Sequence, residues 1–278
     1  MEIKYVALII LDISGYTRFM KQHTTSLLHA EVIITDLLET VIDHADYPLT
    51  LTKLEGDAAF LYAVIGKRDK KAAQDILGQV TAIFDAFKAR ERVLIACDAC
   101  LCEACKNIDK LRLKAFMHVG PAVIRKIRQF EELAGEDVIL IHRLLKNSIT
   151  THEYILMTEP FHKLSGGPLD HTSELRTENC EGIGDVPVRV FFPPEDTTPL
   201  PKRPIGPPIP GTKIGILSNR FSKHVYQRIF SDSPRATFAH LEDYPLTRLS
   251  FLSHIKEVTG HILETIRNMV RAAVTRPG

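Results

Sequence analysis

The stretch Ile9-Ile10-Leu11-Asp12-Ile13-Ser14-Gly15-Tyr16-Thr17-Arg18-Phe19 leads from an apolar strand into a helix. Residues 6–11 are continuously apolar, which is typical of a central strand and too short to span a membrane. Asp12 ends this run, and burying an acid is costly unless a cation or hydrogen-bond donors meet it. The glycine corner also offers backbone N–H groups at a helix start, where phosphate binds well. Taken alone, the same pattern is that of a helix cap formed by Asp12.

A second acid lies in the same kind of place. Residues 50–53 and 58–64 predict two strands, and Glu55-Gly56-Asp57 predicts the tight turn between them. If the two apolar strands are neighbours, Asp12 and Asp57 converge at one edge of the sheet. Close carboxylates repel each other unless a cation lies between them. Mg²⁺ or Mn²⁺ with a nucleotide phosphate fits such a pair, because both metals prefer oxygen ligands.

The rest of the first 193 residues alternates helices with antiparallel strand pairs. Gly120-Pro121 is interpreted as the turn of a second hairpin. The predicted helices cover 17–44, 70–92 and 138–147, and the remaining predicted strands cover 111–119, 122–127, 154–157 and 186–192. This order indicates an α+β fold, with helices on one face of a mainly antiparallel sheet.

Composition excludes several classes of protein. The chain of 278 residues has a formal net charge of +1, which predicts no nucleic-acid partner. No apolar run is long enough for a transmembrane segment, and no signal peptide is recognisable, so we expect a cytoplasmic protein. Eight of the sixteen prolines lie between residues 193 and 210. We therefore predict a domain at 1–193, a stiff Pro-rich linker at 194–212 and a helical C-terminal extension at 213–278.

Four of the five cysteines lie within nine residues, at Cys97, Cys100, Cys102 and Cys105. This spacing does not suit a disulfide framework, which spreads its cysteines over the chain. The cluster is either a Zn²⁺ site or a group of reduced thiols. Four ligands from one short loop would be cramped around a tetrahedral ion, so three thiolates with a fourth ligand from elsewhere are the easier arrangement.

The motifs resemble those of class III adenylate/guanylate cyclases. Residues 12–17 resemble the Asp-Ile-x-Gly-Phe-Thr motif, and residues 53–57 resemble the Lys-x-x-Gly-Asp hairpin. Segments 113–120, 135–144 and 181–183 resemble three further elements in the same order. With the Cys-x-Cys-x-x-Cys insert, the chain is most similar to an uncharacterised bacterial cyclase-like family of unknown function. The resemblance implies a ferredoxin-like sheet over about residues 1–193.

The resemblance also implies roles for individual residues. Asp12 and Asp57 would hold two Mg²⁺ or Mn²⁺ ions, and Arg143 would be catalytic, stabilising charge at the α-phosphate. Lys53 would bind the base, with Glu132 as its acidic partner, which favours ATP. The implied phosphate ligands are the backbone amides near Ile13, Ser14, Gly15 and Tyr16. Such cyclases are dimers with sites at the interface, so a homodimer that binds a nucleoside triphosphate is expected.

Two residues depart from this pattern. Ile139 replaces the asparagine that positions the ribose, and Glu181 replaces the lysine that neutralises the triphosphate. Losing one preorganised donor typically costs roughly 10²–10³ in rate. These departures leave two functions open: a weak adenylate cyclase that makes cyclic AMP, or a catalytically inactive dimeric module that senses nucleotide or metal.

Overall fold

The computed structural model describes residues 2–22, 27–97, 107–168, 171–194, 198–201 and 259. The chain divides into two compact units. The first, here called the sheet unit, comprises 1–14, 40–87 and 112–197, and the second comprises 15–39, 88–111 and 198–278. All the described strands belong to the sheet unit, and so do Asp12, Lys53, Asp57 and Arg143.

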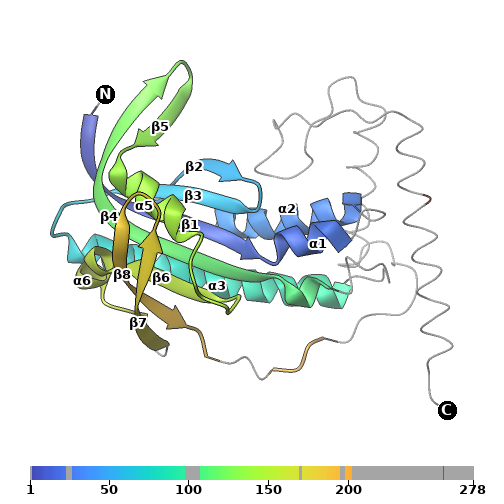
Figure 1. Ribbon diagram of the computed structural model, residues 1–278. Helices are drawn as coiled ribbons and strands as arrows, with labels where there is room; N and C mark the ends of the chain where they lie inside the picture. Colours follow the sequence, from blue (N-terminus) through green and yellow to red (C-terminus); the bar gives the residue numbers. More distant parts are fainter. Residues whose placement is uncertain are drawn as a thin grey trace, which may run out of the picture. The chain divides into compact units, whose positions relative to one another are not determined.

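One eight-stranded sheet organises the sheet unit. Its strands are β1 (Glu2–Ser14), β2 (Thr50–Glu55), β3 (Ala58–Val64), β4 (Arg112–Ile127), β5 (Phe130–Ala134), β6 (Tyr154–Thr158), β7 (Thr172–Cys180) and β8 (Gly184–Phe192). The strand order is β2-β3-β1-β4-β6-β8-β7, with β5 paired to β4. Only the β4–β6 pair among these neighbours is parallel. The predicted α+β class with a mainly antiparallel sheet is confirmed, and Figure 1 shows β1 between β3 and β4.

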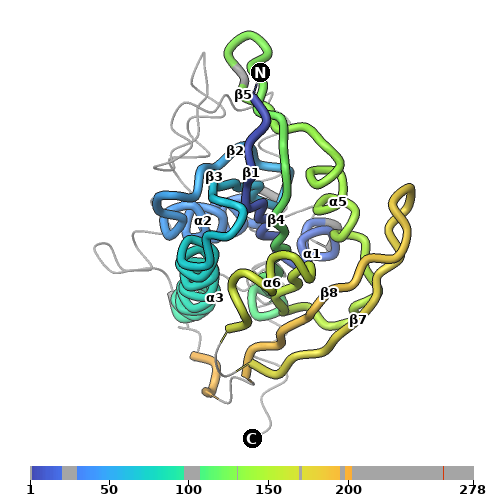
Figure 2. Tube along the Cα trace, turned by 90° about the vertical axis from the view of Figure 1, so that its left-hand side faces the viewer, coloured from blue at the N-terminus to red at the C-terminus, as the bar shows by residue number. Residues whose placement is uncertain are grey.

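Helices lie on both faces of this sheet, rather than on one face as predicted (Figure 2). The described helices are α1 (Tyr16–Gln22), α2 (Leu27–Asp43), α3 (Lys70–Cys97), the short 3₁₀ helix η2 (Ile108–Lys110), α5 (Glu136–Leu144) and α6 (Glu159–Ser165). Residues 70–87 of α3 lie on one side of β1, β3 and β4, and α5 lies on the other (Figure 2). The α5 face has its own apolar core, in which Ile141 and Leu144 join Leu8, Ile10 and Phe60.

The β1 run and the β2–β3 hairpin follow the predicted pattern. Residues 6–11 of β1 are all buried, as expected for a strand with neighbours on both sides. β3 covers the predicted range 58–64, and Gly56 adopts a φ of 68° in the turn. β3 pairs with β1 in the register Asp12↔Ala58. β1 and β3 are therefore neighbouring strands, as predicted.

The predicted hairpin turn at Gly120-Pro121 is wrong, because β4 runs straight through both residues. The turn lies instead at residues 128–129, before β5. On the side away from β1, β4 pairs with β6 at 114–117 and with β5 at 123–127, so residues 118–122 have no strand there. A proline without an N–H donor is tolerated at such an edge position.

Gly120 allows a close approach rather than a turn. A Cβ atom added to it would lie 2.3 Å from Cγ of Asp137, in the first turn of α5. Asp137 in turn lies 2.7 Å from Nε2 of the buried His118, whose Nδ1 is 2.7 Å from Oγ1 of Thr158. The glycine therefore lets α5 sit against β4.

Several expectations fall outside the described residues. The cysteines Cys100, Cys102 and Cys105 lie there, and so does nearly all of the predicted extension at 213–278. Cys97 is the last residue of α3. The linker at 194–212 is described only at residues 194 and 198–201. No helix within the described ranges is both long and apolar enough to cross a membrane.

Candidate functional site

The structure brings Asp12 and Asp57 to one end of the β1–β3 pair. Asp12 is near the end of β1, opposite Ala58, and Asp57 directly precedes Ala58 in the β2–β3 turn. The N–H of Ile13 donates a 3.1 Å hydrogen bond to the carbonyl oxygen of Asp57, which ties the turn to β1. The two acids are thus held by backbone pairing rather than by flexible loops. This arrangement suits a site that needs fixed ligands.

Burial raises the pKa of both carboxyls, and the charge of Asp12 adds to the rise at Asp57. The pKa of Asp57 rises to about 6, first because of burial and second because of the charge of Asp12. Burial also raises the pKa of Asp12, although the charge of Lys114 opposes that rise. Repulsion reaches Asp57 only because the two side chains are close. A divalent cation between them would remove this repulsion.

Lys114 is a neighbour that sequence reasoning missed. It pairs with Asp12 across β1 and β4 and with Tyr154 across β4 and β6. Its ammonium lies 5.5 Å from the centre of the Tyr154 ring, and its charge acts on both acids. The register of three strands creates this row, so no spacing in the sequence could reveal it. Lys114 is a cation that could reach a phosphate held by the acids.

The corner after β1 is built around Gly15. Gly15 has a φ of 92°, which favours glycine over other residues. Its carbonyl accepts a 2.8 Å bond from the N–H of Phe19, which begins α1. Oγ of the buried Ser14 lies 3.0 Å from Nδ1 of His152. One predicted phosphate ligand, the backbone N–H of Ile13, is therefore engaged with the carbonyl oxygen of Asp57, and the side chain of Ser14 meets His152.

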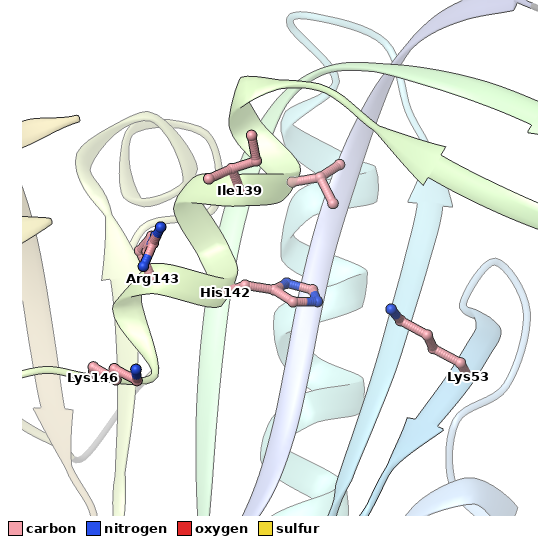
Figure 3. A pocket seen from close by; sticks show the side chains of 6 residues that line it. Lys53, Ile139, His142, Arg143 and Lys146 are labelled. Carbon is pink, nitrogen blue, oxygen red and sulfur yellow. The ribbon is translucent and has the colours of Figure 1, made fainter. Parts of the chain in front are cut away.

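A second feature is a hollow of about 430 Å³ between β2 and α5. Its lining combines cationic and apolar side chains, namely Lys53, Val138, Ile139, His142, Arg143 and Lys146. Lys53 of β2 and His142 of α5 point toward one another in Figure 3, while Arg143 of α5 and Lys146, which follows the helix, lie on the other side of His142 from Lys53. A pocket lined by several cationic side chains and an apolar wall suits an anionic ligand.

The acid that contacts Lys53 is Glu55, whereas the predicted partner was Glu132. Oε1 of Glu55 is 2.6 Å from Nζ of Lys53 and 3.3 Å from Nε2 of His142. The predicted partner, Glu132, belongs to β5 and pairs with Arg125 of β4. Residues 53 and 55 alternate with Leu54 on one strand, so their side chains share a face. This period-2 spacing is a signal from which the sequence could have identified the pair.

Arg143 makes an ion pair with Glu181, one of the two residues that depart from the cyclase pattern. The distance from Nη1 of Arg143 to Oε2 of Glu181 is 2.8 Å. Glu181 lies in the turn between β7 and β8, and its side chain is 84% exposed. Ile139, the other departure, lines the hollow with 54% of its surface exposed. Glu181 therefore already forms an ion pair with Arg143, the arginine that was predicted to bind phosphate.

The donor set at Asp12 and Asp57 fits Mg²⁺ or Mn²⁺. Mg²⁺ keeps several waters and is bound through one or two carboxylates together with substrate phosphates. Within the described part of the chain, no cluster of three or more His, Cys, Asp or Glu residues could hold a metal by itself. A closed structural metal site supplies all its ligands from the protein. The pair Asp12 and Asp57 instead suits a metal ion that is also bound by the phosphates of a nucleotide.

Solved structures that this chain resembles include nucleotide cyclases. The adenylyl cyclase CyaB from P. aeruginosa superposes with a TM-score of 0.51 at 16% identity, over 71% of this chain and 98% of that one. The guanylate cyclase domain of RhGC from Catenaria anguillulae, solved with GTP, gives 0.50 at 13% identity, over 70% of this chain and all of that one. A bacterial light-regulated adenylyl cyclase gives 0.52 at 12% identity, over 70% and 55%. At these identities the likeness shows the fold alone.

Sequence comparison identifies the family. Residues 34–154 match the family described as "Protein of unknown function (DUF2652)". The protein named "Uncharacterized protein Rv2561/Rv2562", from Mycobacterium tuberculosis, is 34% identical over 153 residues, which are 55% of this chain and 70% of that protein. The chain therefore belongs to the family of this mycobacterial protein, and its sheet has the class III adenylate/guanylate cyclase fold.

Proposed function

We propose that the protein is a divalent-metal-dependent nucleotide-binding domain that converts ATP to cyclic AMP at a low rate. The observation that carries the proposal is the pair of carboxyls at the end of β1 and β3. Asp57 has a pKa near 6 partly because Asp12 repels it, and protein interiors retain such unfavourable pairs mainly at functional sites. The fold adds support, because the solved structures that it resembles include an adenylyl cyclase and a guanylate cyclase domain.

In the proposed reaction the 3′-hydroxyl oxygen of ATP attacks the α-phosphorus. Its proton passes to solvent water, the bond from the α-phosphorus to the bridging oxygen breaks, and pyrophosphate departs. Mg²⁺ or Mn²⁺ would lower the pKa of the attacking hydroxyl and neutralise phosphate charge. Asp12 and Asp57 would hold the metal, and Lys114 would approach the phosphates from β4. Arg143 meets the charge that develops at the α-phosphate.

The low rate follows from two side chains. Ile139 has no donor for the ribose, and loss of one such donor typically lowers a rate by roughly 10²–10³. Glu181 holds the Arg143 guanidinium at 2.8 Å, so phosphate competes with an internal carboxylate. The two acids are present, whereas the ribose donor is replaced by Ile139 and Arg143 is paired with Glu181.

The proposal includes assembly and location. Asp12 and Asp57 lie at the end of β1, whereas Arg143 is on α5, so we place the acids of one subunit opposite Arg143 of the partner in a homodimer. ATP as substrate implies a cytoplasmic protein. Residues 1–193 would form the cyclase-like domain, followed by the Pro-rich linker and a C-terminal extension.

The direct test incubates the purified full chain with ATP and Mn²⁺ and measures cyclic AMP by mass spectrometry. We expect slow product formation that is lost in Asp12→Asn and in Asp57→Asn. Asp75→Asn, an exposed acid of α3, is the matched control and should keep the wild-type rate. GTP should give less product than ATP.

Two other results would reject the enzyme. ATP binding without any cyclic product would make the protein a nucleotide sensor, the alternative that the sequence left open. Product formation that survives in both acid variants would mean that a different site, or a contaminant, performs the reaction.

A further inference from the structure

Helix α2 is buried around its whole circumference, although two of the buried residues are acids. At 3.6 residues per turn, the four consecutive positions 36–39 face nearly every direction around the helix. Each of them is at most 6% exposed, namely Asp36, Leu37, Leu38 and Glu39. A surface helix would instead leave one polar face in water. Because an ionised carboxylate is costly to bury alone, the groups around α2 have to include cations as well as apolar side chains.

A third buried acid lies beside them on α3. The guanidinium of Arg90 forms a bidentate ion pair with the Asp36 carboxylate, in which Nη2 lies 2.7 Å from Oδ2. The next residue along α3, Glu91, is only 4% exposed, and Glu39 lies about one turn along α2 from Asp36. The three acids, here called the α2–α3 acids (Asp36, Glu39 and Glu91), are thus grouped around the Arg90 contact between the two helices.

The Pro-rich linker lies against the same end of α3. Arg92 donates from Nη2 to the carbonyl oxygen of Pro199 at 2.6 Å and from Nη1 to that of Thr198 at 3.4 Å. Lys202 and Arg203 follow directly in the sequence, and a chain spans at most about 3.5 Å per residue. The segment that comes after the linker therefore starts within reach of the α2–α3 acids.

The charges of the chain are divided unevenly at this point. Residues 202–278, here called the basic segment, contain 12 Lys and Arg but only 5 Asp and Glu, a formal net charge of +7. Residues 1–201 contain 23 Lys and Arg and 29 Asp and Glu, a net charge of −6, so the total of +1 conceals two opposite parts. The compact unit that contains the α2–α3 acids also includes residues 198–278. Opposite net charges within one chain favour association of the two parts.

We infer that the basic segment docks on α2 and on the end of α3 of its own chain, with its lysines and arginines at the α2–α3 acids. Its Phe, Ile and Leu residues suit the apolar positions of α2. Attachment through the linker favours the chain's own segment over a second copy, because a short tether gives a high effective concentration. The inference does not rest on the proposed function, since the α2–α3 acids belong to neither the metal pair nor the hollow.

The first experiment is zero-length carbodiimide cross-linking of the full chain, which joins a lysine amine to a carboxylate that it contacts. Equal amounts of ¹⁵N-labelled and unlabelled protein are mixed, so that mass spectrometry separates links within one chain from links between two. We expect lysines of the basic segment to be joined, within one chain, to acids of residues 27–39 and 88–97. Links to these helices only between two copies would assign the surface to a second copy and overturn the inference. Links of these lysines only to other acids, or none, would also overturn it.

The second experiment compares trypsin cleavage within the basic segment in the wild type, in Glu91→Gln and in the matched control Asp75→Asn. Glu91→Gln keeps the shape but removes the charge, so we expect cleavage there to be about tenfold faster, the size expected for losing a hydrogen bond to a charged group. Asp75 is an exposed acid of α3 outside this unit, and its variant should keep the wild-type rate.

Slow cleavage within residues 1–201 shows that a variant is folded. Equal cleavage of the basic segment in all three folded proteins would contradict docking on these acids, and if Glu91→Gln does not fold, the cross-links of the wild type decide. Neither measurement needs a nucleotide, so the result is independent of whether the chain makes cyclic AMP.

Discussion

At the scale of single residues, Asp57 determines how the site responds to pH. Its pKa is about 6 in the folded protein, compared with an ordinary value of 3.8. A carboxyl with a raised pKa binds its proton more tightly when folded, so it destabilises the native state once it must ionise. The metal-free protein therefore loses stability as pH rises from about 4 to about 6, and the penalty stays constant above that range.

Asp57→Asn removes this penalty. In the absence of metal, the variant should match the wild type near pH 4 and be more stable at pH 7.5 by about 1 kcal/mol, a value reduced for solvent screening of a partly exposed carboxylate. Urea unfolding at the two pH values measures the difference. Saturating Mn²⁺ with nucleotide should reverse the order at pH 7.5, because the wild type then gains binding energy. A variant that is equally destabilised at both pH values would contradict the assignment.

Glu181 offers a gain-of-function prediction. Glu181→Gln releases Arg143 from its ion pair and removes negative charge near the phosphates. Because the pair is exposed, the expected gain in the rate of cyclic AMP formation is modest, up to about fivefold. Glu174→Gln, which removes a similar exposed carboxylate paired with Arg176 of the same strand, is the control and should leave the rate unchanged. A rate that falls in Glu181→Gln would show that this acid helps the reaction.

The sequence allowed part of the site to be predicted, for a physical reason. Asp12 and Asp57 each adjoin a glycine turn at the end of an apolar strand, and neighbouring strands bring such positions together. Lys114 could not be predicted because its place beside Asp12 depends on the register of β1 and β4. Whether these residues bind metal, and whether Lys53 binds a base, stays a prediction.

At the scale of elements, Gly120 controls how closely α5 approaches β4. Gly120→Ala would place a methyl group against the Asp137 carboxylate, which also contacts buried His118. Because that carboxylate cannot move away without losing its contact, we expect a loss of about 1–3 kcal/mol in the free energy of unfolding. Thermal and urea unfolding measure it.

Gly78→Ala is the matched control for this prediction. Gly78 lies on the exposed side of α3, and an added Cβ meets nothing within 4 Å. Alanine favours a helix interior over glycine, so this variant should gain up to about 1 kcal/mol. Equal effects of the two substitutions would show that the close approach of α5 to β4 has no energetic weight.

Two elements, β7 and α6, were not predicted because their sequences lack a recognisable apolar periodicity. β7 is largely exposed and rich in charged residues, so no alternation of apolar residues marks it, as is common for an edge strand. α6 has only seven residues, too few for helical periodicity to be recognised. The straight course of β4 through Gly120-Pro121 depends on a gap between two other strands, which only the assembled sheet provides.

At the scale of the whole molecule, a shared active site predicts complementation between subunits. Asp57→Asn and Arg143→Ala should each be inactive as homodimers. A mixed dimer would hold one site with both intact residues, so an equal mixture that has exchanged subunits should recover about a quarter of the wild-type activity. Mixtures of Asp12→Asn with Asp57→Asn, which damage the same half of the site, should recover none. Failure of the first mixture, despite proven exchange, would contradict the shared site.

Binding of Mn²⁺ tests the central claim most directly, because it does not require turnover. Electron paramagnetic resonance measures free Mn²⁺ in the presence of 3′-deoxy-ATP and the full chain. We expect the wild type to bind Mn²⁺ more tightly than the nucleotide alone does. Asp57→Asn should weaken this binding at least about tenfold, the size expected for losing a charged ligand, while Asp75→Asn leaves it unchanged. Equal Mn²⁺ affinity in the wild type and in Asp57→Asn would contradict the account.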